Sequence, residues 1–462
     1  MIINNDRVFV HFLWIAFYCT FGEVKGGMRR SPRNLRIAFN HRGLTHYGGV
    51  FFFHEFLRVL QLRYWLHRRL HYPRRNHDYS LPQMVLALVY PIMLGLDRLE
   101  TAALLRTNGT FQYLTGLPSY PDPQSLRRFL LQAPPDFREQ LHRFNDWLLA
   151  QFIHRPEHRS RLILDLDSTV VTVFGRQEGA EVGYNPRYRG KRSYDPLLCV
   201  EANSEFLWDT ELRAGNAGTW DGSPGLLASC FLSLPADLRE LRVRADAGFG
   251  FHAVLAMLEA RRAQYAVVAR MASGLKHKLA SLRYERLNAR WEIGEGEYRA
   301  QGWPQARRCL VARRRIEETE PELTLFTLER YAYRAWLTNL SLTPAGVWHH
   351  YDGRAGMERR IRELREDFAL CKIPTRAFAA NALYLEVVRL AYNLVTAFQQ
   401  TCVPEAWRHL TLSKLRHKLF WLPGELTRPQ RRPTLRLAET PENRTLMEEV
   451  LSMVHKQKPL SE

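Results

Sequence analysis

The chain has 462 residues, of which 46% are hydrophobic and 12% aromatic, so it is long enough for two or three packed domains and is not a disordered protein. Lys and Arg outnumber Asp and Glu by 66 to 47, and the formal net charge is +19. This excess favours a polyanionic partner, because side chains that neutralise phosphates release condensed counterions. A soluble protein with a basic surface and no such partner is the alternative interpretation.

The N-terminal residues 1–44 are expected to be a poorly defined segment. The apolar stretch at residues 8–21 is shorter than the roughly 20 residues that a helix needs to span a bilayer. It also lacks the positive charge and cleavage site of a signal peptide, and a translation start placed too far upstream explains it equally well. The six cysteines show no CxxC spacing that would indicate zinc or redox chemistry, so we expect a cytoplasmic protein. Because the apolar stretch is too short to span a bilayer, we expect no membrane partner.

Residues 45–155 form a predicted α-helical DNA-binding domain, since apolar residues recur there at helical spacing between Pro-rich joints. In the segment PDPQSLRRFL, Pro and Asp precede a basic helix. We expect Arg127 and Arg128 of this helix to face a DNA backbone, and a solvated helix end is the alternative.

Residues 156–272 are predicted to form the first part of an α/β catalytic core. The segment RLILDLDSTVVTVFG has the composition of a buried strand, and the patterns that follow give the order β-β-β-α-β-α-β over residues 161–270. Short runs rich in aromatics and Arg predict a β-rich insertion over residues 273–340. Helical periodicity returns over residues 341–402 as the second part of the core, and residues 403–462 form a basic C-terminal segment.

A short segment of the core combines positive charge with aromatic rings. We expect it to grip DNA strands by charge and stacking, and a solvated basic loop is the alternative. Its charged residues are Arg187, Arg189, Lys191 and Arg192, and its rings are Tyr184, Tyr188 and Tyr194.

Two aspartates, Asp167 in LILDLDST and Asp246 in LRVRADAGF, end predicted strands. Side chains at the carboxyl ends of neighbouring parallel strands converge on one crevice. Two like charges there are unfavourable unless a cation neutralises them, so the pair predicts a metal site, and oxygen ligands favour magnesium or manganese over zinc. Asp165, on the same strand face, is an alternative first ligand.

A predicted helix supplies a third acid. Glu358 would reach the metal ions, while Arg354 and Arg365 contact a phosphate. A solvated carboxylate or a helix-surface ion pair is the alternative for any single acid. The expectation rests on steps of three, four and seven residues, close to whole helical turns, which place four side chains along one face: Tyr351, Arg354, Glu358 and Arg365.

These motifs resemble the Asp-Asp-Glu (DDE) transposases of bacterial insertion sequences, specifically the group numbered thirteen-eighty. The resemblance covers most of the chain and is carried by DLDST, GYNPRYRGKRSYDPLLC, RAGN, RADAGF and the helix Y-x2-R-x3-E-x6-R. It implies a ribonuclease-H-like mixed sheet with flanking helices and a β-rich insertion, preceded by the helical domain. It also implies that Asp167, Asp246 and Glu358 are catalytic, metal-binding acids, although Arg365 stands where the Tyr-Arg-Glu-Lys signature usually has Lys.

The resemblance further implies phosphoryl transfer with two Mg²⁺ ions, or Mn²⁺, per active site. The expected partners are double-stranded DNA, at transposon ends and target, and at least a second copy of the chain for synapsis, in the bacterial nucleoid. Tyr351 is expected to position DNA rather than to act as a nucleophile. Related transposases stack an aromatic on a base turned out of the duplex, and the insertion offers three tryptophans for this role: Trp291, Trp303 and Trp336.

Two other functions stay open at this stage. Another ribonuclease-H-like nuclease, such as a resolvase, would use the same carboxylates without recognising transposon ends. A DNA-binding protein derived from a transposase would have lost catalysis, and the intact Asp167, Asp246 and Glu358 count against it.

Overall fold

The computed structural model describes residues 37–38, 41, 43–74, 78–153, 161–218, 220–316, 326–328 and 331–462. The chain divides into the units Met1–Arg42 and Gly43–Glu462, and every element named below belongs to the second. Almost all of the predicted N-terminal segment, residues 1–44, therefore lies outside the described residues. None of the helices in the described ranges combines the length and the apolar character that a membrane span requires.

Helices occupy most of the chain between residues 50 and 153. In α3 (Leu81–Leu94), Ser80 and Gln83 form a capping box at the start, and Gly95, with a φ of 79°, ends the helix. The other helices of this stretch are α1 (Val50–Val59), α2 (Leu62–Arg69), α4 (Ala103–Arg106), α5 (Gly109–Leu114), α6 (Pro123–Leu131) and α7 (Phe137–Ile153).

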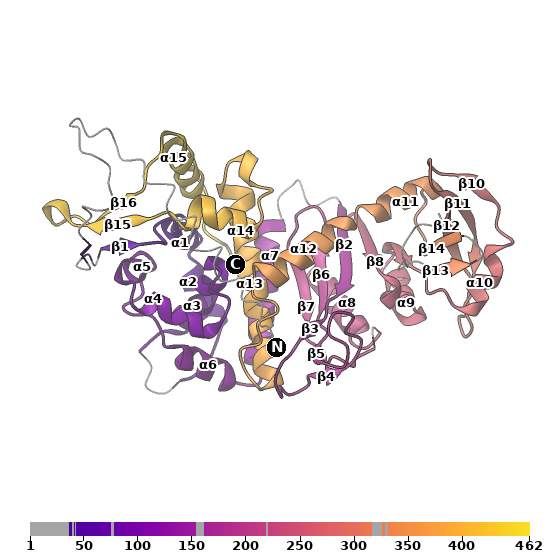
Figure 1. Ribbon diagram of the computed structural model, residues 1–462, viewed down its shortest axis with the longest axis horizontal. Coiled ribbons are helices and arrows are strands. Elements are labelled where there is room, and N and C mark those ends of the chain that lie inside the picture. The colour runs from indigo at the N-terminus through magenta and orange to yellow at the C-terminus, as the bar shows by residue number, and fades with distance from the viewer. Residues whose placement is uncertain are drawn as a thin grey trace. The chain divides into compact units, whose positions relative to one another are not determined.

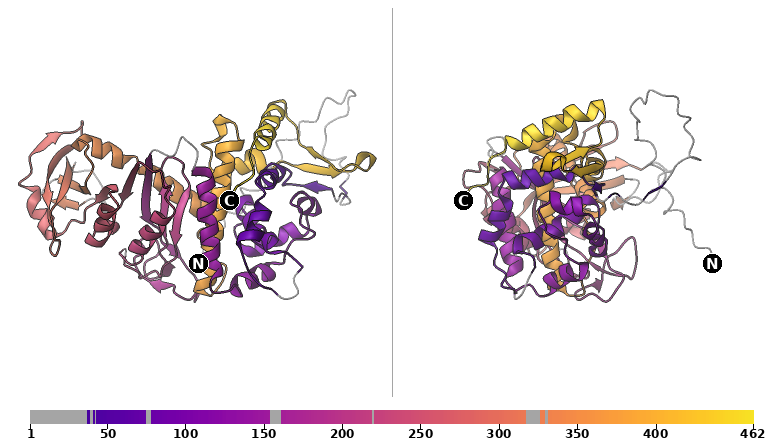
Figure 2. Two further views of the ribbon diagram at one scale, coloured as in Figure 1. Left: turned by 180° about the vertical axis from the view of Figure 1, so that it is seen from behind. Right: turned by 90° about the vertical axis from the view of Figure 1, so that its left-hand side faces the viewer.

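One long buried helix, α13 (Phe378–Cys402), connects these helices to the sheet. It runs beside α7 and also contacts α3 and the strand β7 (Leu207–Glu211), so it is covered on several sides (Figure 2). The C-terminal part of the chain completes this half. It consists of α14 (Leu412–Leu415), α15 (Pro441–His455), which packs on α1 and α13, and a sheet of β1 (Leu44–Thr45), β15 (Gly424–Thr427) and β16 (Thr434–Leu437).

A ten-stranded mixed sheet forms the other half (Figure 1). At its centre β2 (Arg161–Ser168) pairs in parallel with β8 (Glu240–Ala245) and antiparallel with β6 (Leu197–Glu201). Apart from three short strands after β2, the order β2-β6-β7-α8-β8-α9-β9 is the one predicted over residues 161–270. The remaining elements are α8 (Ser223–Leu232), α9 (His252–Ala260) and β9 (Gln264–Val268).

The strands of the predicted insertion extend this same sheet. β14 (Tyr331–Thr338) pairs antiparallel with β9, with Trp336 opposite Val268. A small separate core, which includes Leu310, Trp336 and Val347, forms where α11 (Pro344–Asp352) packs on the insertion strands. The other elements are α10 (Ser273–Leu279), β10 (Tyr284–Arg286), β11 (Glu292–Tyr298), β12 (Arg307–Arg315) and β13 (Phe326–Leu328).

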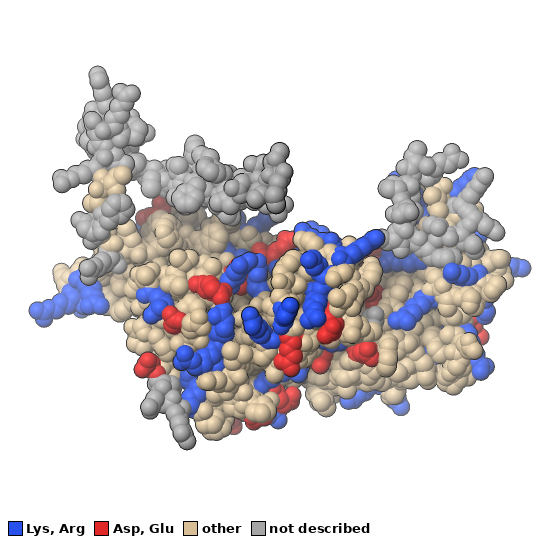
Figure 3. Space-filling model, turned by 60° about the horizontal axis from the view of Figure 1, so that its bottom comes forward, with Lys and Arg blue, Asp and Glu red and all other residues tan. Residues whose placement is uncertain are grey.

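A three-stranded sheet follows the end of β2. It contains β3 (Val171–Thr172), β5 (Arg192–Tyr194) and β4 (Glu181–Val182), in that order. This small sheet lies on the lower side of Figure 1, which Figure 3 turns toward the viewer, and Lys and Arg side chains gather on that face.

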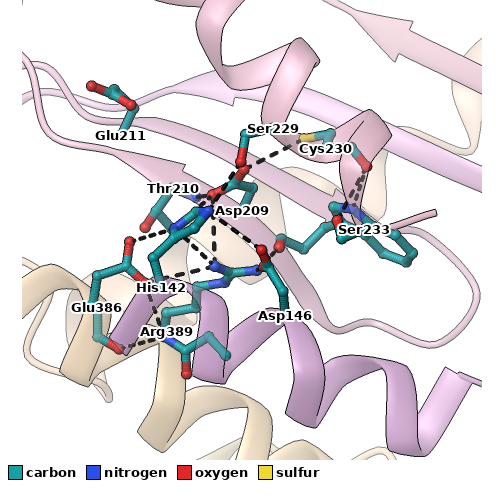
Figure 4. Close-up of polar contacts among 12 residues, drawn as sticks. His142, Asp146, Asp209, Thr210, Glu211, Ser229, Cys230, Ser233, Glu386 and Arg389 are labelled. Atoms are coloured by element: carbon teal, nitrogen blue, oxygen red, sulfur yellow. Dashed lines mark hydrogen bonds and ion pairs between the residues drawn. The ribbon is translucent and has the colours of Figure 1, made fainter. Parts of the chain in front are cut away.

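A buried polar cluster joins the helices to the large sheet (Figure 4). Arg389 of α13 is fully buried, donates to Asp146 of α7 at 2.6 Å and lies 3.7 Å from Asp209 of β7. His142 of α7 contacts Glu386 of α13 at 3.0 Å. Since a buried charge without its partner is strongly unfavourable, the cluster fixes how α7, β7 and α13 pack against one another.

Stability is expected to fall at alkaline pH because of His142. Burial lowers the pKa of His142, but the Glu386 and Asp209 carboxylates outweigh this effect and raise it from 6.5 to about 9. A pKa that is higher in the folded state means that the imidazolium stabilises the fold below pH 6.5. This contribution, at most about 3 kcal/mol, is lost as the pH rises from the unfolded-state value through the folded-state value.

Urea denaturation at pH 6.5 and above pH 9 measures this loss as a decrease in the free energy of unfolding. A His142→Gln variant should lack most of the decrease. An equal decrease in the variant would show that other groups cause it.

Candidate active site

Strand pairing brings Asp167 and Asp246 to one edge of the large sheet. β2 and β8 are parallel with Leu166 opposite Ala245, so each aspartate directly follows a paired residue. The pKa of Asp167 is raised from 3.8 to about 6. Burial and the Asp246 carboxylate raise it, and together they outweigh the Arg354 cation, which lowers it. The two carboxylates therefore lie within each other's electrostatic field, which is the situation that a bound cation relieves.

Arg354 holds the end of β2. It lies just before α12 (Ala355–Glu366) and is buried. Its Nη2 lies 2.8 Å from Asp167 Oδ2 and donates to the Leu166 carbonyl at 2.9 Å. Arg354 was expected to contact a phosphate, but here its guanidinium is bound to protein groups and positions Asp167.

Glu358 lies on α12 between Arg354 and Arg365, and its side chain is exposed. Arg365 donates to Thr169 Oγ1 at 2.9 Å, so this helix contacts the chain just after β2. Among the residues that the structure describes, no three His, Cys, Asp or Glu side chains gather closely enough to hold a metal ion. The structure thus brings Asp167 and Asp246 together without adding Glu358 to a common ligand set.

Tyr351 does not share a helix with Glu358. α11 ends at Asp352 and α12 begins at Ala355, and Tyr351 belongs to the first of these helices. Its ring is buried, with its centre 5.7 Å from that of Trp336, and the Arg334 guanidinium lies over it at 4.9 Å. The expectation of one continuous helical face, with Tyr351 available to DNA, does not describe this structure.

Asp165, the alternative first ligand, forms a buried ion pair with Arg244. The Nε and Nη2 atoms of Arg244 donate to its two carboxylate oxygens at 2.6 and 2.7 Å. Arg244 also donates to the His350 carbonyl at 2.7 Å. A Cβ atom at Gly353 would lie 2.6 Å from Arg244 Nη1, so the turn between α11 and α12 passes close over this pair. Both oxygens of Asp165 are already neutralised.

Sequence reasoning missed Asp195, which lies beside the two catalytic candidates. It precedes β6, whose Leu197 pairs with Ser168 at the end of β2. Burial raises the pKa of Asp195, the Arg213 guanidinium lowers it, and the Asp246 carboxylate raises it further. The predicted hairpin could have indicated Asp195, because the start of an antiparallel neighbour of β2 must lie at the end of β2.

The basic segment is solvent-exposed. None of its four cations is paired with a carboxylate of the described residues, and all lie on the hairpin of β4 and β5 or on the loop between these strands. They are Arg187, Arg189, Lys191 and Arg192.

The two arginines of α6 differ from each other. Arg127 is half-buried, pairs with Glu100 and donates to the Pro374 carbonyl at 3.2 Å. Arg128 is exposed. Of the two predicted DNA contacts, Arg128 is therefore the one whose charge faces solvent.

The three tryptophans of the insertion are not equally accessible. Trp303 and Trp336 are buried, and Arg307 covers Trp303 at 4.8 Å. Trp291 is half-buried, and its ring centre lies 5.1 Å from that of Trp348. Only Trp291 exposes part of its ring without a rearrangement of the insertion.

Comparison with known proteins identifies the family. The family model described as Transposase DDE domain group 1 matches residues 29–459 of the sequence. The chain therefore belongs to this family of DNA-transposition enzymes, which use divalent metal ions. Among solved structures, the piggyBac transposase synaptic complex with hairpin DNA is similar over 82% of this chain and 82% of that chain, at 10% sequence identity and a TM-score of 0.46. No curated protein matches the chain.

Removal of Asp165 is expected to act on stability rather than on metal binding. An Asp165→Leu variant leaves Arg244 as a buried unpaired cation, and we expect the free energy of unfolding to fall by about 3 kcal/mol or more in urea denaturation. The double variant Asp165→Leu/Arg244→Met replaces the whole pair and should recover most of this loss. Loss of DNA cleavage with unchanged stability would instead make Asp165 a metal ligand.

Proposed function

We propose that the protein is the DNA transposase of an insertion sequence of the group numbered thirteen-eighty. It binds the terminal inverted repeats of its element and catalyses DNA cleavage and strand transfer. The observation that carries the proposal is the parallel pairing of β2 and β8, which puts Asp167 and Asp246 at one edge of the sheet in a chain of the DDE family.

The residues at this edge suit a hard divalent cation. Two carboxylates lie at the ends of the paired strands, and the Asp246 carboxylate contributes to the raised pKa of Asp167. Oxygen ligands of this kind select Mg²⁺ or Mn²⁺. We propose that Asp167, Asp246 and Glu358 hold two such ions, which would activate the attacking oxygen and stabilise the leaving one. Glu358 is exposed and would complete the set by a movement of its side chain or of α12.

The arginines around the acids have positioning roles in this proposal. Arg354 fixes the carboxylate of Asp167, and Arg365 fixes the chain that follows β2. The exposed cations Arg128, Arg187 and Arg189, with Lys191 and Arg192, bind the phosphate backbone. The partners are the DNA of the element's ends and of the target, together with a second copy of the chain that holds the other end, in the cytoplasm at the nucleoid.

Substitution of the acids is expected to remove cleavage and keep DNA binding. Asp167→Asn, Asp246→Asn and Glu358→Gln should each lower Mg²⁺-dependent cleavage of a terminal-repeat duplex by at least about a thousandfold, since each removes a metal ligand. Gel shift should report DNA affinity close to that of the wild type.

Glu366→Gln is the matched control for the third acid, because Glu366 is also an exposed glutamate of α12. It should cleave like the wild type. If Glu358→Gln also cleaves like the wild type, Glu358 is not the third ligand.

A second function is favoured by one observation. Because Asp167 is bound to Arg354 and Glu358 stands outside a ligand set, a DNA-binding protein that has lost catalysis is compatible with the same fold. Strand transfer by purified wild-type protein on terminal-repeat DNA with Mg²⁺ separates the two. Binding without any cleavage, in both Mg²⁺ and Mn²⁺, would favour the non-catalytic protein.

A further inference from the structure

Most of the exposed aromatic rings belong to one stretch of the chain. Phe174, Tyr184, Tyr188 and Trp220 are 77%, 83%, 40% and 61% exposed, and all four lie between the end of β3 and the start of α8. The other large aromatics that the described residues leave exposed, Tyr64 and Tyr113, are on α2 and α5. A single exposed ring needs no explanation, but a group of them marks a binding surface.

The hairpin of β4 and β5 and the loop after β7 carry most of these rings and lie against each other. Ala214, in the loop after β7, bridges to Tyr194 at the end of β5. A Cβ atom at Gly215 would lie 2.2 Å from the Ser193 carbonyl oxygen, and one at Gly183 would lie 1.8 Å from the Gly215 carbonyl oxygen. Backbone therefore packs directly on backbone, and the loop that carries Trp220 lies against the hairpin that carries Tyr184 and Tyr188.

A buried guanidinium anchors the Trp220 loop beside the two catalytic candidates. Arg213 donates to the carbonyls of Gly218 and Asp221, on either side of Trp220, at 2.9 and 2.6 Å. The same guanidinium pairs with Asp195 at 2.6 Å, at the start of β6. Trp220 is thus exposed on a loop whose position is fixed from the edge of the sheet that bears Asp167 and Asp246.

Positive charge lies beside the rings of the hairpin. Arg187 lies over the Tyr188 ring at 5.5 Å, and Phe174 meets Tyr188 edge to face at 5.8 Å. Arg189, Lys191 and Arg192 are exposed on the same hairpin, and Figure 3 shows many Lys and Arg side chains, with Asp and Glu among them, on the side of the molecule to which the hairpin belongs. A basic surface with accessible ring faces is complementary to nucleotides whose bases are unpaired, because a paired base inside a duplex offers no free face for stacking.

We propose that the aromatic surface of Phe174, Tyr184, Tyr188 and Trp220 binds unpaired nucleotides of the DNA end beside the catalytic carboxylates, with Trp220 stacked on a base. The proposal rests on the proposed function and specifies its substrate as an end with locally separated strands. Trp303 and Trp336 are buried, so this loop presents a tryptophan to DNA where those two positions of the insertion do not.

Binding of the full-length protein to two fluorescent probes tests the proposal. The probes are a single strand of about 20 nucleotides and the duplex of the same sequence, at one salt concentration. Since each stacked base contributes measurably, Trp220→Ala should weaken single-strand binding at least about fivefold and duplex binding less than about twofold. Trp220→Phe, which keeps a ring, should retain most of the single-strand affinity.

Tyr113→Ala is the matched control, since this exposed ring lies on α5, outside the aromatic surface. It should leave both affinities unchanged. Tyr184→Ala, at the most exposed ring of the surface, is a second variant that cannot disturb a buried core. Unchanged single-strand binding in both Trp220→Ala and Tyr184→Ala would overturn the proposal, and so would an equal loss for single strand and duplex.

Failure of the proposed function has a different outcome. If the wild-type protein does not cleave DNA, but Trp220→Ala still weakens its binding to the single strand, the proposal for the aromatic surface is supported and the proposed transposase activity is not.

Discussion

A single buried cation, Arg354, ties the helix after the insertion to the end of the central strand. Burial lowers its pKa, but Asp167, Asp246 and Asp165 outweigh this effect and raise it. The guanidinium thus pairs with Asp167 and offsets the repulsion between Asp167 and Asp246, whereas Arg244 neutralises Asp165. Arg354 also donates to the Leu166 carbonyl, so the same guanidinium fixes the backbone at the end of β2 and neutralises the carboxylate that follows it.

Local patterns predicted the part of the site that depends on neighbouring strands. Asp167 and Asp246 lie at one edge of the sheet because β2 and β8 are parallel neighbours, although β6, β7 and α8 separate these strands along the chain. The helix-borne residues were harder to place. The prediction from spacing required one continuous helix, whereas the turn at Gly353 separates Tyr351 from Glu358. The spacing also gives no information about the ion pair of Arg354 with Asp167. Such contacts between remote segments leave no local pattern.

The same limit applies to the fold. Periodicity identified the strands and helices of residues 161–270, and the aromatic and Arg-rich runs were correctly taken as strands. It did not reveal that β14 would pair with β9, because sheet partners about 70 residues apart are selected by packing and register. Nor did it show that α13 would be held between α7 and β7 by Arg389, Glu386 and His142, since each of these is an ordinary charged residue until its partners are known.

The pairing of β14 with β9 has a mechanical consequence. β9 is also hydrogen-bonded to β8, whose last residue precedes Asp246, so the insertion and the second acid belong to one continuous ladder. A load applied to β14 is transmitted through two rows of backbone hydrogen bonds, from β14 to β9 and from β9 to β8, to the end of the strand that precedes Asp246. The insertion strands are therefore mechanically coupled to Asp246 through the backbone of the sheet itself.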